Sequence, residues 1–366
     1  MKKIDYFVVG PDPRRTDIAN PGGQLTATSG LLQFAADSGL ELAFIDTLQG
    51  SFPVPPVHVR VTKAVRRLLQ VLWHSTLRRP RRGMIIFSAG PGSFLERGFA
   101  GLIARLLGVK TVVCLRSGSL LPYLGAASSL GRVITALIRL QPRILVQGHS
   151  WLPILERAGV NSSRIRVVAN WIGPAKQLAE RPRRARRDHP IRFVFVGWLV
   201  AEKGVRELIE ACEQLAASGS VFHLTVVGGG TLHKEIAQRV EVAKLHDRVS
   251  VLGWVDPGDV ATLMDEADVF VLPTYFEGFP NALIEAFALG LPAISTPVGA
   301  IPDSLVDGEN GFLVTPGNSK HLAVAMGRYI ANPSLVAQQS VRALETVVAK
   351  HDFRTNCASL FAAVEG

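Results

Sequence analysis

Two glutamates in the second half of the chain, Glu277 and Glu285, flank a turn and the expected start of a helix. Gly278, Phe279 and Pro280 form the turn after Glu277, and a helix is expected to begin near Asn281. The free N–H groups and positive dipole end of a helix that begins there favour a bound phosphate. Glu285, one turn into the helix, could accept hydrogen bonds from neutral hydroxyls such as a ribose diol. A simpler interpretation stays open, in which Glu285 is a helix-start carboxylate and Glu277 a solvated turn residue.

A lysine and several glycines follow two strands of the same half. One strand ends at Gly197, and Lys203 lies beside the start of a helix expected over residues 202–217, where its ammonium could meet an anion or stay solvated. Gly228–Gly230 follow the next strand and suit either a close backbone approach to a ligand or a tight turn. Their spacing is not that of a dinucleotide-binding fingerprint, and no Walker A lysine is present.

The first half has two weaker candidates at strand ends. Gly22 and Gly23 follow the first strand just before a helix, as a phosphate-approaching loop or a wide turn. Arg116 follows a later strand and could face a ligand cleft. Loops at the carboxyl ends of parallel strands are where α/β sheets bind their ligands, so both positions are candidates.

Several catalytic patterns are absent from the sequence. There is no HExxH and no Cys/His cluster, which argues against a zinc hydrolase. No Asp-x-Asp pair can hold a divalent cation on a nucleotide diphosphate, and no Gly-x-Ser-x-Gly elbow occurs. Cys114, Cys212 and Cys357 are widely spaced in apolar surroundings, so we expect neither disulfides nor a zinc site. The sequence therefore predicts a site without metal and a cytoplasmic location.

The elements that must position these residues are short apolar strands alternating with amphipathic helices, the pattern of parallel sheets covered on both faces. Residues 173–190, rich in Pro and Arg, interrupt the pattern as a linker. We therefore expect an α/β protein with two doubly wound, Rossmann-like domains facing a central cleft, over residues 1–172 and 191–350. Residues 351–366 are expected to form a C-terminal helix that could pack back on the first domain.

The formal net charge of +10 is unevenly distributed. Residues 1–172 contain 22 Lys/Arg and 8 Asp/Glu (+14), residues 173–190 contain 6 and 2 (+4), and residues 191–366 contain 12 and 20 (−8). The basic half should meet something anionic: a membrane surface, a lipid phosphate, a nucleic acid or an acidic glycan. No apolar run is long enough to cross a bilayer, and the first residues do not resemble a signal peptide.

Between Thr47 and Leu95 the chain has eight basic residues and no acidic one. Five apolar residues in this segment recur at helical spacing among arginines: Val65, Leu68, Leu69, Leu72 and Trp73. One interpretation is an interfacial helix on an anionic leaflet. We favour an ordinary domain helix whose apolar stripe packs on the sheet, while the surrounding arginines still steer the protein to a membrane or a lipid diphosphate.

Taken together, these segments resemble the retaining glycosyltransferases of family 4, group 1 glycosyltransferases with the GT-B fold. The tract EGFPNALIE matches the family's E-x7-E motif at Glu277 and Glu285, and the similarity continues through GLPAISTPVGAIPDSLVDGENGFLVTPGN. VFVGWLVAEKG looks like the family's VGRL..EKG segment, VANWIG its NGID-like segment, and PGGQ its first-domain glycine loop. The resemblance covers both domains and is strongest over residues 191–320.

The resemblance implies a role for each matching residue. Glu285 would bind the ribose hydroxyls of a nucleotide-sugar donor, Glu277 would contact the transferring sugar, and Lys203 would neutralise the diphosphate. Other positions implied to contact the donor are the strand-end Gly197, the backbone of residues 278–281, the loop of Gly22 and Gly23 and, around the base, Trp254 and Val255.

Two positions depart from the family pattern. Trp198 stands where the family usually has an arginine, so one diphosphate cation is missing and Lys203, Arg116 or another arginine must compensate. Arg116–Ser117–Gly118 stands where many relatives have His-Gly, which puts any step that uses that histidine in doubt. His149, at the end of a first-domain strand, is either a substitute or a structural residue.

The expected function is metal-independent transfer of a sugar, from a UDP-sugar rather than a GDP-sugar and with no cofactor, to a lipid-linked or polysaccharide acceptor in cell-surface glycan synthesis. With retention implied by the family, the leaving diphosphate could deprotonate the acceptor on the same face, or Glu277 could form a covalent intermediate. We expect a cytoplasmic protein, peripheral on the inner membrane face, with no nucleic acid partner. Two alternatives stay open: a nucleotide-sugar epimerase on the same fold, and a basic nucleic-acid-binding protein, for which no binding motif is found.

Overall fold

The computed structural model describes residues 4–15, 23–47, 56–88, 90–173, 182–183 and 189–366. The chain divides into two compact units. Unit 1 comprises Met1–Pro174 together with Asp352–Gly366, and unit 2 comprises Ala175–His351. The expected linker lies mostly outside the described residues, as does Gly22.

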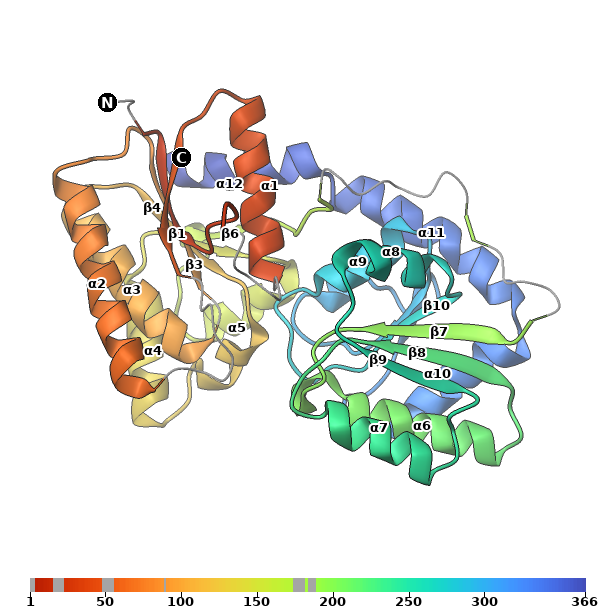
Figure 1. Ribbon diagram of the computed structural model, residues 1–366. Coiled ribbons are helices and arrows are strands. Elements are labelled where there is room, and N and C mark those ends of the chain that lie inside the picture. Colours follow the sequence, from red (N-terminus) through yellow and green to blue (C-terminus); the bar gives the residue numbers. More distant parts are fainter. Residues whose placement is uncertain (1–3, 16–22, 48–55, 89, 174–181, 184–188) are drawn as a thin grey trace. The chain divides into compact units, whose positions relative to one another are not determined.

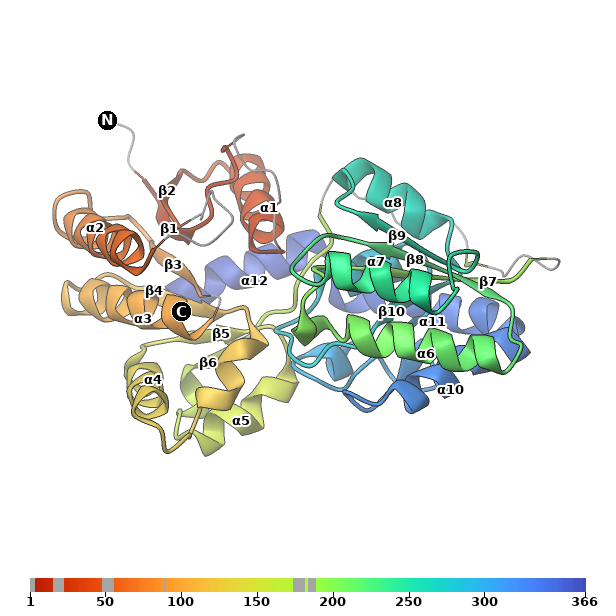
Figure 2. The same ribbon diagram turned by 60° about the horizontal axis from the view of Figure 1, so that its bottom comes forward.

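Unit 1 contains a parallel sheet of six strands in the order β2-β1-β3-β4-β5-β6. The strands are β1 (Tyr6–Gly10), β2 (Leu42–Asp46), β3 (Gly83–Ser88), β4 (Thr111–Leu115), β5 (Ile144–Val146) and β6 (Ile165–Val167). The helices are α1 (Gly23–Asp37), α2 (Val57–Thr76), α3 (Pro91–Leu106), α4 (Ser129–Leu140), α5 (Leu152–Arg157) and α12 (Phe353–Glu365). Figures 1 and 2 show α2 and α3 on one face of this sheet and α1 and α12 on the other.

Helix α12 completes the core of unit 1, although it comes from the far end of the chain. The ring of Phe361 lies 4.8 Å from that of Tyr6 in β1 and 5.6 Å from that of Phe34 in α1. Phe353, Cys357 and Phe361 are buried in one apolar cluster with the sheet residues, so α12 covers this face as an integral layer.

Helix α2 differs from the sequence-based expectation, which was wrong about its apolar stripe. The helix docks through another face: Val71 and Ser75 are buried, and Arg67 pairs with Glu96 of α3. The stripe points away from the sheet, with Leu68 half-buried and the following residues exposed: Val65, Leu69, Leu72 and Trp73. The amphipathic spacing predicted the helix correctly. However, Val71 and the polar residues Arg67 and Ser75, rather than the apolar stripe, contact the rest of unit 1.

Unit 2 contains a second parallel six-stranded sheet, in the order β12-β11-β10-β7-β8-β9. Its strands are β7 (Ile191–Val196), β8 (Phe222–Val227), β9 (Val249–Gly253), β10 (Val269–Leu272), β11 (Ala293–Ser295) and β12 (Gly311–Leu313). Its helices are α6 (Val205–Ala217), α7 (His233–Val242), α8 (Pro257–Asp265), α9 (Asn281–Ala288), α10 (Ser319–Ala331) and α11 (Ser334–Lys350). Helices α6 and α7 cover one face, and α8 and α9 the other (Figures 1 and 2).

The expected class, an α/β protein with two doubly wound sheets, is confirmed. Helices on both faces bury the strands, which explains their continuous apolar sequences. One boundary differs from the prediction: α6 begins at Val205 rather than at residue 202, because Gly204 takes the left-handed conformation (φ 69°) and interrupts the helix. Within the described residues, no helix is both long and apolar enough to span a membrane.

The packing of α12 predicts that Phe361→Ala destabilises unit 1. Phe361 is 5% exposed, and removal of a buried ring leaves a cavity that costs about 3–5 kcal/mol. Urea unfolding followed by circular dichroism measures the loss. Ser359→Ala, on the exposed side of the same helix, should change the unfolding free energy by less than about 0.5 kcal/mol. Equal effects of the two variants would show that α12 does not hold the core together.

Candidate functional site

The candidate site lies at the carboxyl edge of the unit 2 sheet, where the strand order reverses. From β7 the chain proceeds to β8 and β9 on one side, and from the neighbouring β10 to β11 and β12 on the other. Such a reversal leaves room at the carboxyl ends of the two central strands, where doubly wound sheets bind ligands. The loops after β7 and β10 carry Lys203 and Glu277, so the topology brings both residues to this point.

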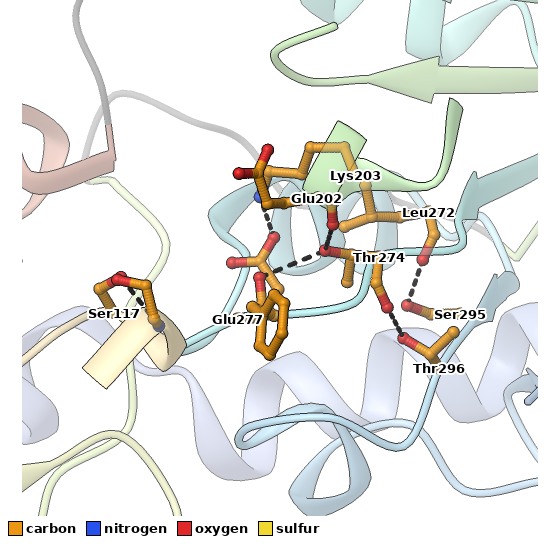
Figure 3. Close-up of polar contacts among 10 residues, drawn as sticks. Ser117, Glu202, Lys203, Leu272, Thr274, Glu277, Ser295 and Thr296 are labelled. Carbon is orange, nitrogen blue, oxygen red and sulfur yellow. Dashed lines mark hydrogen bonds and ion pairs between the residues drawn. The ribbon is translucent and has the colours of Figure 1, made fainter. Parts of the chain in front are cut away.

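Lys203 and Glu277 form an ion pair, in which Lys203 Nζ donates to Glu277 Oε1 (Figure 3). The two side chains are 22% and 11% exposed, so both charges are largely withdrawn from water. Partial burial strengthens their attraction, because the local dielectric is lower than that of water. The pair is therefore an organised charge site rather than two solvated side chains at loop ends.

The loop that carries Lys203 is held by its backbone against the end of β10. The carbonyl oxygen of Glu202 accepts hydrogen bonds from the N–H of Tyr275 (2.8 Å) and from Oγ1 of Thr274 (2.9 Å). A Cβ atom at Gly204 would overlap the carbonyl oxygen of Pro273, so only glycine permits this approach. The glycine after Lys203 therefore sets the distance between the two loops.

The loop that carries Glu277 is fixed from its other side by residues that follow β11. Thr296 Oγ1 donates to the carbonyl oxygen of Thr274 (2.6 Å), and both threonines are fully buried (Figure 3). The N–H of Ala300 donates to the carbonyl oxygen of Gly278 (2.9 Å). Gly299 has φ 55°, and a Cβ atom there would overlap the carbonyl oxygen of Glu277. Three loops thus interlock around the ion pair.

Tyr275, two residues before Glu277, ties the same loop to α6. Its hydroxyl donates to Glu207 Oε1 (2.7 Å). Burial, followed by this carboxylate, raises the pKa of Tyr275 to about 12, so the phenol stays protonated and keeps the hydrogen bond.

Helix α9 begins directly after this turn, at Asn281, as the sequence predicted. Gly278, Phe279 and Pro280 are buried, and the Phe279 ring packs 5.2 Å from that of His351. Pro280, at the N-cap, provides no side-chain hydrogen bond to the first turn. Glu285 follows in the second turn and is half-buried.

The ends of β7, β8 and β9 meet through their glycines and a pair of tryptophans. The N–H of Gly197 donates to Val227 (3.0 Å), and that of Gly228 donates to the carbonyl oxygen of Gly253 (2.8 Å). The indoles of Trp198 and Trp254 lie edge to face, with ring centroids 4.6 Å apart. Trp254 remains 49% exposed, and half-buried Val255 follows it. The residue in place of the usual arginine thus supports an exposed aromatic ring.

The first-domain candidates are described within unit 1. Gly23 is the first residue of α1. Arg116 follows β4, and its Nη2 donates to Oδ1 of Asn170 (2.7 Å) while the guanidinium lies over the rings of Phe87 and Trp171. Burial lowers the pKa of Arg116 to about 10, which leaves it charged at neutral pH. Its role toward a diphosphate stays a prediction.

Comparison with known proteins bears on the domain that holds the ion pair. Residues 176–345 match the family model described as glycosyl transferases group 1. Over these residues, somewhat less than half of the chain, the sequence is similar to the group 1 glycosyltransferases. The expected resemblance is thereby confirmed for the part of the chain that carries Lys203, Glu277 and Glu285.

Two curated relatives of the chain are named for polysaccharide synthesis. The amylovoran biosynthesis glycosyltransferase AmsK of Erwinia amylovora is 29% identical over 63% of this chain and 59% of its own length. The putative teichuronic acid biosynthesis glycosyltransferase TuaC of Bacillus subtilis is 35% identical over 46% of this chain and 40% of its own length. The chain thus spans about 40 to 59% of the length of these two relatives.

Solved glycosyltransferases share the fold. Sucrose-phosphate synthase from Thermosynechococcus elongatus matches 97% of this chain and 96% of its own, with a TM-score of 0.77 and 21% identity. Anabaena HepE, solved in complex with UDP-glucose, matches 97% and 98% with a TM-score of 0.69 and 16% identity. The expected GT-B architecture is confirmed by these neighbours.

The residues that hold the two loops together were not recognised from the sequence. Thr274 and Thr296 were not singled out, although Thr274 lies two residues after β10 and Thr296 directly after β11, positions where a buried hydroxyl must find a backbone partner. The contact between Trp198 and Trp254 was also missed, because the two tryptophans are far apart in the sequence. Within the described residues no group of three or more His, Cys, Asp or Glu is arranged to hold a metal ion.

The close approach at Gly204 predicts that Gly204→Ala displaces the Lys203 loop. Gly219→Ala is the matched control, since both glycines have positive φ (69° and 78°) but only Gly204 has a carbonyl oxygen in the way. The control should cost about 1 kcal/mol, and Gly204→Ala at least about 2 kcal/mol more, in urea unfolding of the full chain. Similar losses in the two variants would contradict a steric role for the contact with Pro273.

Proposed function

We propose that the chain transfers a sugar, with retention and without a metal ion, from a nucleotide-sugar donor to a lipid-linked or polysaccharide acceptor. The observation that supports this most is the ion pair of Lys203 and Glu277, at the strand reversal of a group 1 glycosyltransferase domain and beside the start of α9. The pair offers a cation for a diphosphate and a carboxylate for a sugar within one organised loop cluster. Because the chain spans only part of its curated relatives, the activity is our proposal.

The donor would use the groups gathered at the carboxyl edge of unit 2. Lys203 and the start of α9 would receive the diphosphate, since an ammonium and a helix N-terminus both attract anions. Glu285 would accept from the ribose hydroxyls, and the exposed Trp254 with Val255 would receive the base. HepE was solved in complex with UDP-glucose, which favours a uridine nucleotide.

The reaction follows from where charge develops. As the bond between the anomeric carbon and the diphosphate oxygen breaks, negative charge grows on the leaving phosphate and positive charge on the sugar ring. Lys203 and the helix dipole would stabilise the first, and the Glu277 carboxylate the second. The acceptor hydroxyl then bonds to the anomeric carbon on the face from which the diphosphate leaves, so the configuration is preserved. Its proton passes to the leaving phosphate. Until a donor binds, Glu277 and Lys203 neutralise each other.

The names of two relatives support a glycan acceptor, and the positive charge of residues 1–172 supports a location at a membrane surface. AmsK and TuaC are named for amylovoran and teichuronic acid synthesis, so a glycan acceptor of that kind is proposed here. Residues 1–172 hold 22 Lys/Arg against 8 Asp/Glu, an excess that would attract the diphosphate of a lipid-linked acceptor and the anionic inner face of a membrane.

Substitution of the ion pair tests the proposal. Glu277→Ala should abolish transfer, and Lys203→Ala should lower kcat/KM about 10²–10³-fold, because a preorganised charge at the leaving group is lost. Glu202→Ala and Lys234→Ala remove the same charges from exposed neighbouring positions and should retain activity. Transfer of radiolabelled sugar measures the effect, and a fully active Glu277→Ala enzyme would refute the assignment.

The donor and the metal independence are tested together by calorimetry. A panel of UDP-, GDP-, ADP- and TDP-sugars, titrated with and without EDTA, should show tightest binding of a UDP-sugar and the same affinity under chelation. Magnesium-dependent binding would contradict the cation role of Lys203. Conversion of the donor sugar without any acceptor would point to an epimerase instead.

A further inference from the structure

Helix α2 presents an unbroken apolar stripe to solvent. Six apolar residues recur at every fourth position along the helix and its C-cap: Val57, Val61, Val65, Leu69, Trp73 and Leu77. With Leu72 they are between 42% and 71% exposed. Each step of four residues turns about 40° further round the helix axis, so the stripe winds along α2, and its central members Val65, Leu69, Leu72 and Trp73 lie within about 100° of one another on one side. Its 20 residues extend over about 30 Å.

Among the described residues of unit 1, most side chains of this stripe remain exposed to solvent. Other side chains fasten α2 to its neighbours: Val71 and Ser75 are buried, and the His74 ring packs 4.2 Å from that of Phe7 in β1. Arg67 makes two hydrogen bonds to Glu96 of α3, at 2.5 and 2.7 Å. The contacts of α2 with β1 and α3 thus come from side chains outside the apolar stripe.

The charge around the stripe is predominantly positive, although Arg82 pairs with Glu365 and both Arg81 and Arg82 lie near Asp5. Helices α2, α3 and α4 contain a single acidic residue, Glu96, which is neutralised by Arg67. Lys63 and Arg66 are exposed on α2 itself. Beyond the end of α2, four cations and Glu365 line an open cavity of about 470 Å³: Arg79, Arg81, Arg82 and Lys110. An apolar stripe within a basic surface is complementary to a lipid bilayer, in which apolar acyl chains lie beneath anionic headgroups.

The two helices beside α2 continue this surface. Helix α3 packs on α2, and α4 packs on α3, in one layer over the sheet (Figure 2). Their outward apolar side chains are between 39% and 86% exposed: Phe99 and Leu106 on α3, and Leu130, Val133 and Leu140 on α4. Arg105 and Arg132 are exposed among them. Helix α2 therefore carries more exposed apolar side chains than α3 or α4 on a broader basic surface.

We propose that α2 is an interfacial anchor that docks unit 1 on an anionic lipid bilayer. The helix lies in the plane of the membrane, with its apolar stripe between the lipid headgroups and the acyl chains and with Trp73 at that boundary. Lys63, Arg66 and the arginines after the helix bind lipid phosphates. The inference deepens the proposed function, on which its purpose rests, because a lipid-linked acceptor is presented at such a surface.

Co-sedimentation with vesicles tests the anchor without any donor or acceptor. The full chain should bind vesicles of phosphatidylglycerol and phosphatidylcholine and bind phosphatidylcholine vesicles weakly. The variant Leu69→Gln/Leu72→Gln/Trp73→Gln should lose at least about tenfold in vesicle affinity, because three side chains no longer leave water. Val242→Gln/Val324→Gln/Val348→Gln, at three exposed positions of unit 2, also replaces three exposed apolar side chains and should bind as the unchanged chain does.

Several outcomes would overturn the proposal. The first is that the unchanged chain does not bind the anionic vesicles, and the second is that the triple variant binds them as tightly as the unchanged chain. The third is that the unchanged chain binds no vesicles but self-associates in sedimentation velocity, and that the triple variant loses this self-association. Unfolding of the triple variant is checked by circular dichroism. If it does not fold, the difference in fluorescence between the chain and its Trp73→Phe variant gives an independent measure. The Trp73 emission should shift to shorter wavelength on anionic vesicles, and an unshifted emission would refute insertion.

The anchor and the proposed catalysis can fail separately. The triple variant should keep the sugar-donor affinity of the unchanged chain, because α2 belongs to unit 1 and the Lys203 and Glu277 pair to unit 2. A chain that binds vesicles but no nucleotide sugar would retain the anchor and lose the proposed function. A chain that binds nucleotide sugars but no vesicles would retain the proposed function and lose the anchor.

Discussion

The approach of Gly204 to the carbonyl oxygen of Pro273 is the constraint on which the rest of the site depends. It brings the loop after β7 against the loop after β10, and the Glu202 carbonyl then accepts from both Thr274 and Tyr275. A larger side chain at residue 204 would separate the loops, and Lys203 would no longer reach Glu277. The charge pair is thus a consequence of backbone contacts rather than of the attraction between two long side chains, which alone stabilises little.

The interlocked loops also explain how opposite charges persist at a sheet edge. A partly buried charge without a partner is strongly disfavoured, so each member of the pair makes the other tolerable. A diphosphate that approaches Lys203 supplies the negative charge that Glu277 supplied before. The carboxylate is then available to a positively charged sugar ring. In this proposal, donor binding itself activates Glu277, because the diphosphate replaces Glu277 as the partner of Lys203.

Much of the fold could be predicted from the sequence, because strands buried on both faces must be continuously apolar and are separated by helices. The start of α9 at Asn281 was predicted from the turn before it, whereas the start of α6 was misplaced because the left-handed Gly204 gives no hydrophobic signal. The outward stripe of α2 was misjudged, since periodicity shows that a helix has two faces and not which one is buried. For the candidate site, the sequence indicated the residues and the loops but not their hydrogen bonds to carbonyl oxygens, which depend on strand order.

Unit 1 is discontinuous in the sequence: its last helix, α12, follows unit 2 in the chain. During synthesis on the ribosome, all of unit 2 therefore emerges before the face of the first sheet that α12 covers can be closed. The part of that face that α12 covers stays exposed in the meantime, a state in which hydrophobic surface favours association with other chains. A chaperone that shields it until α12 has been synthesised would act at a step in which the order of translation and the order of packing differ.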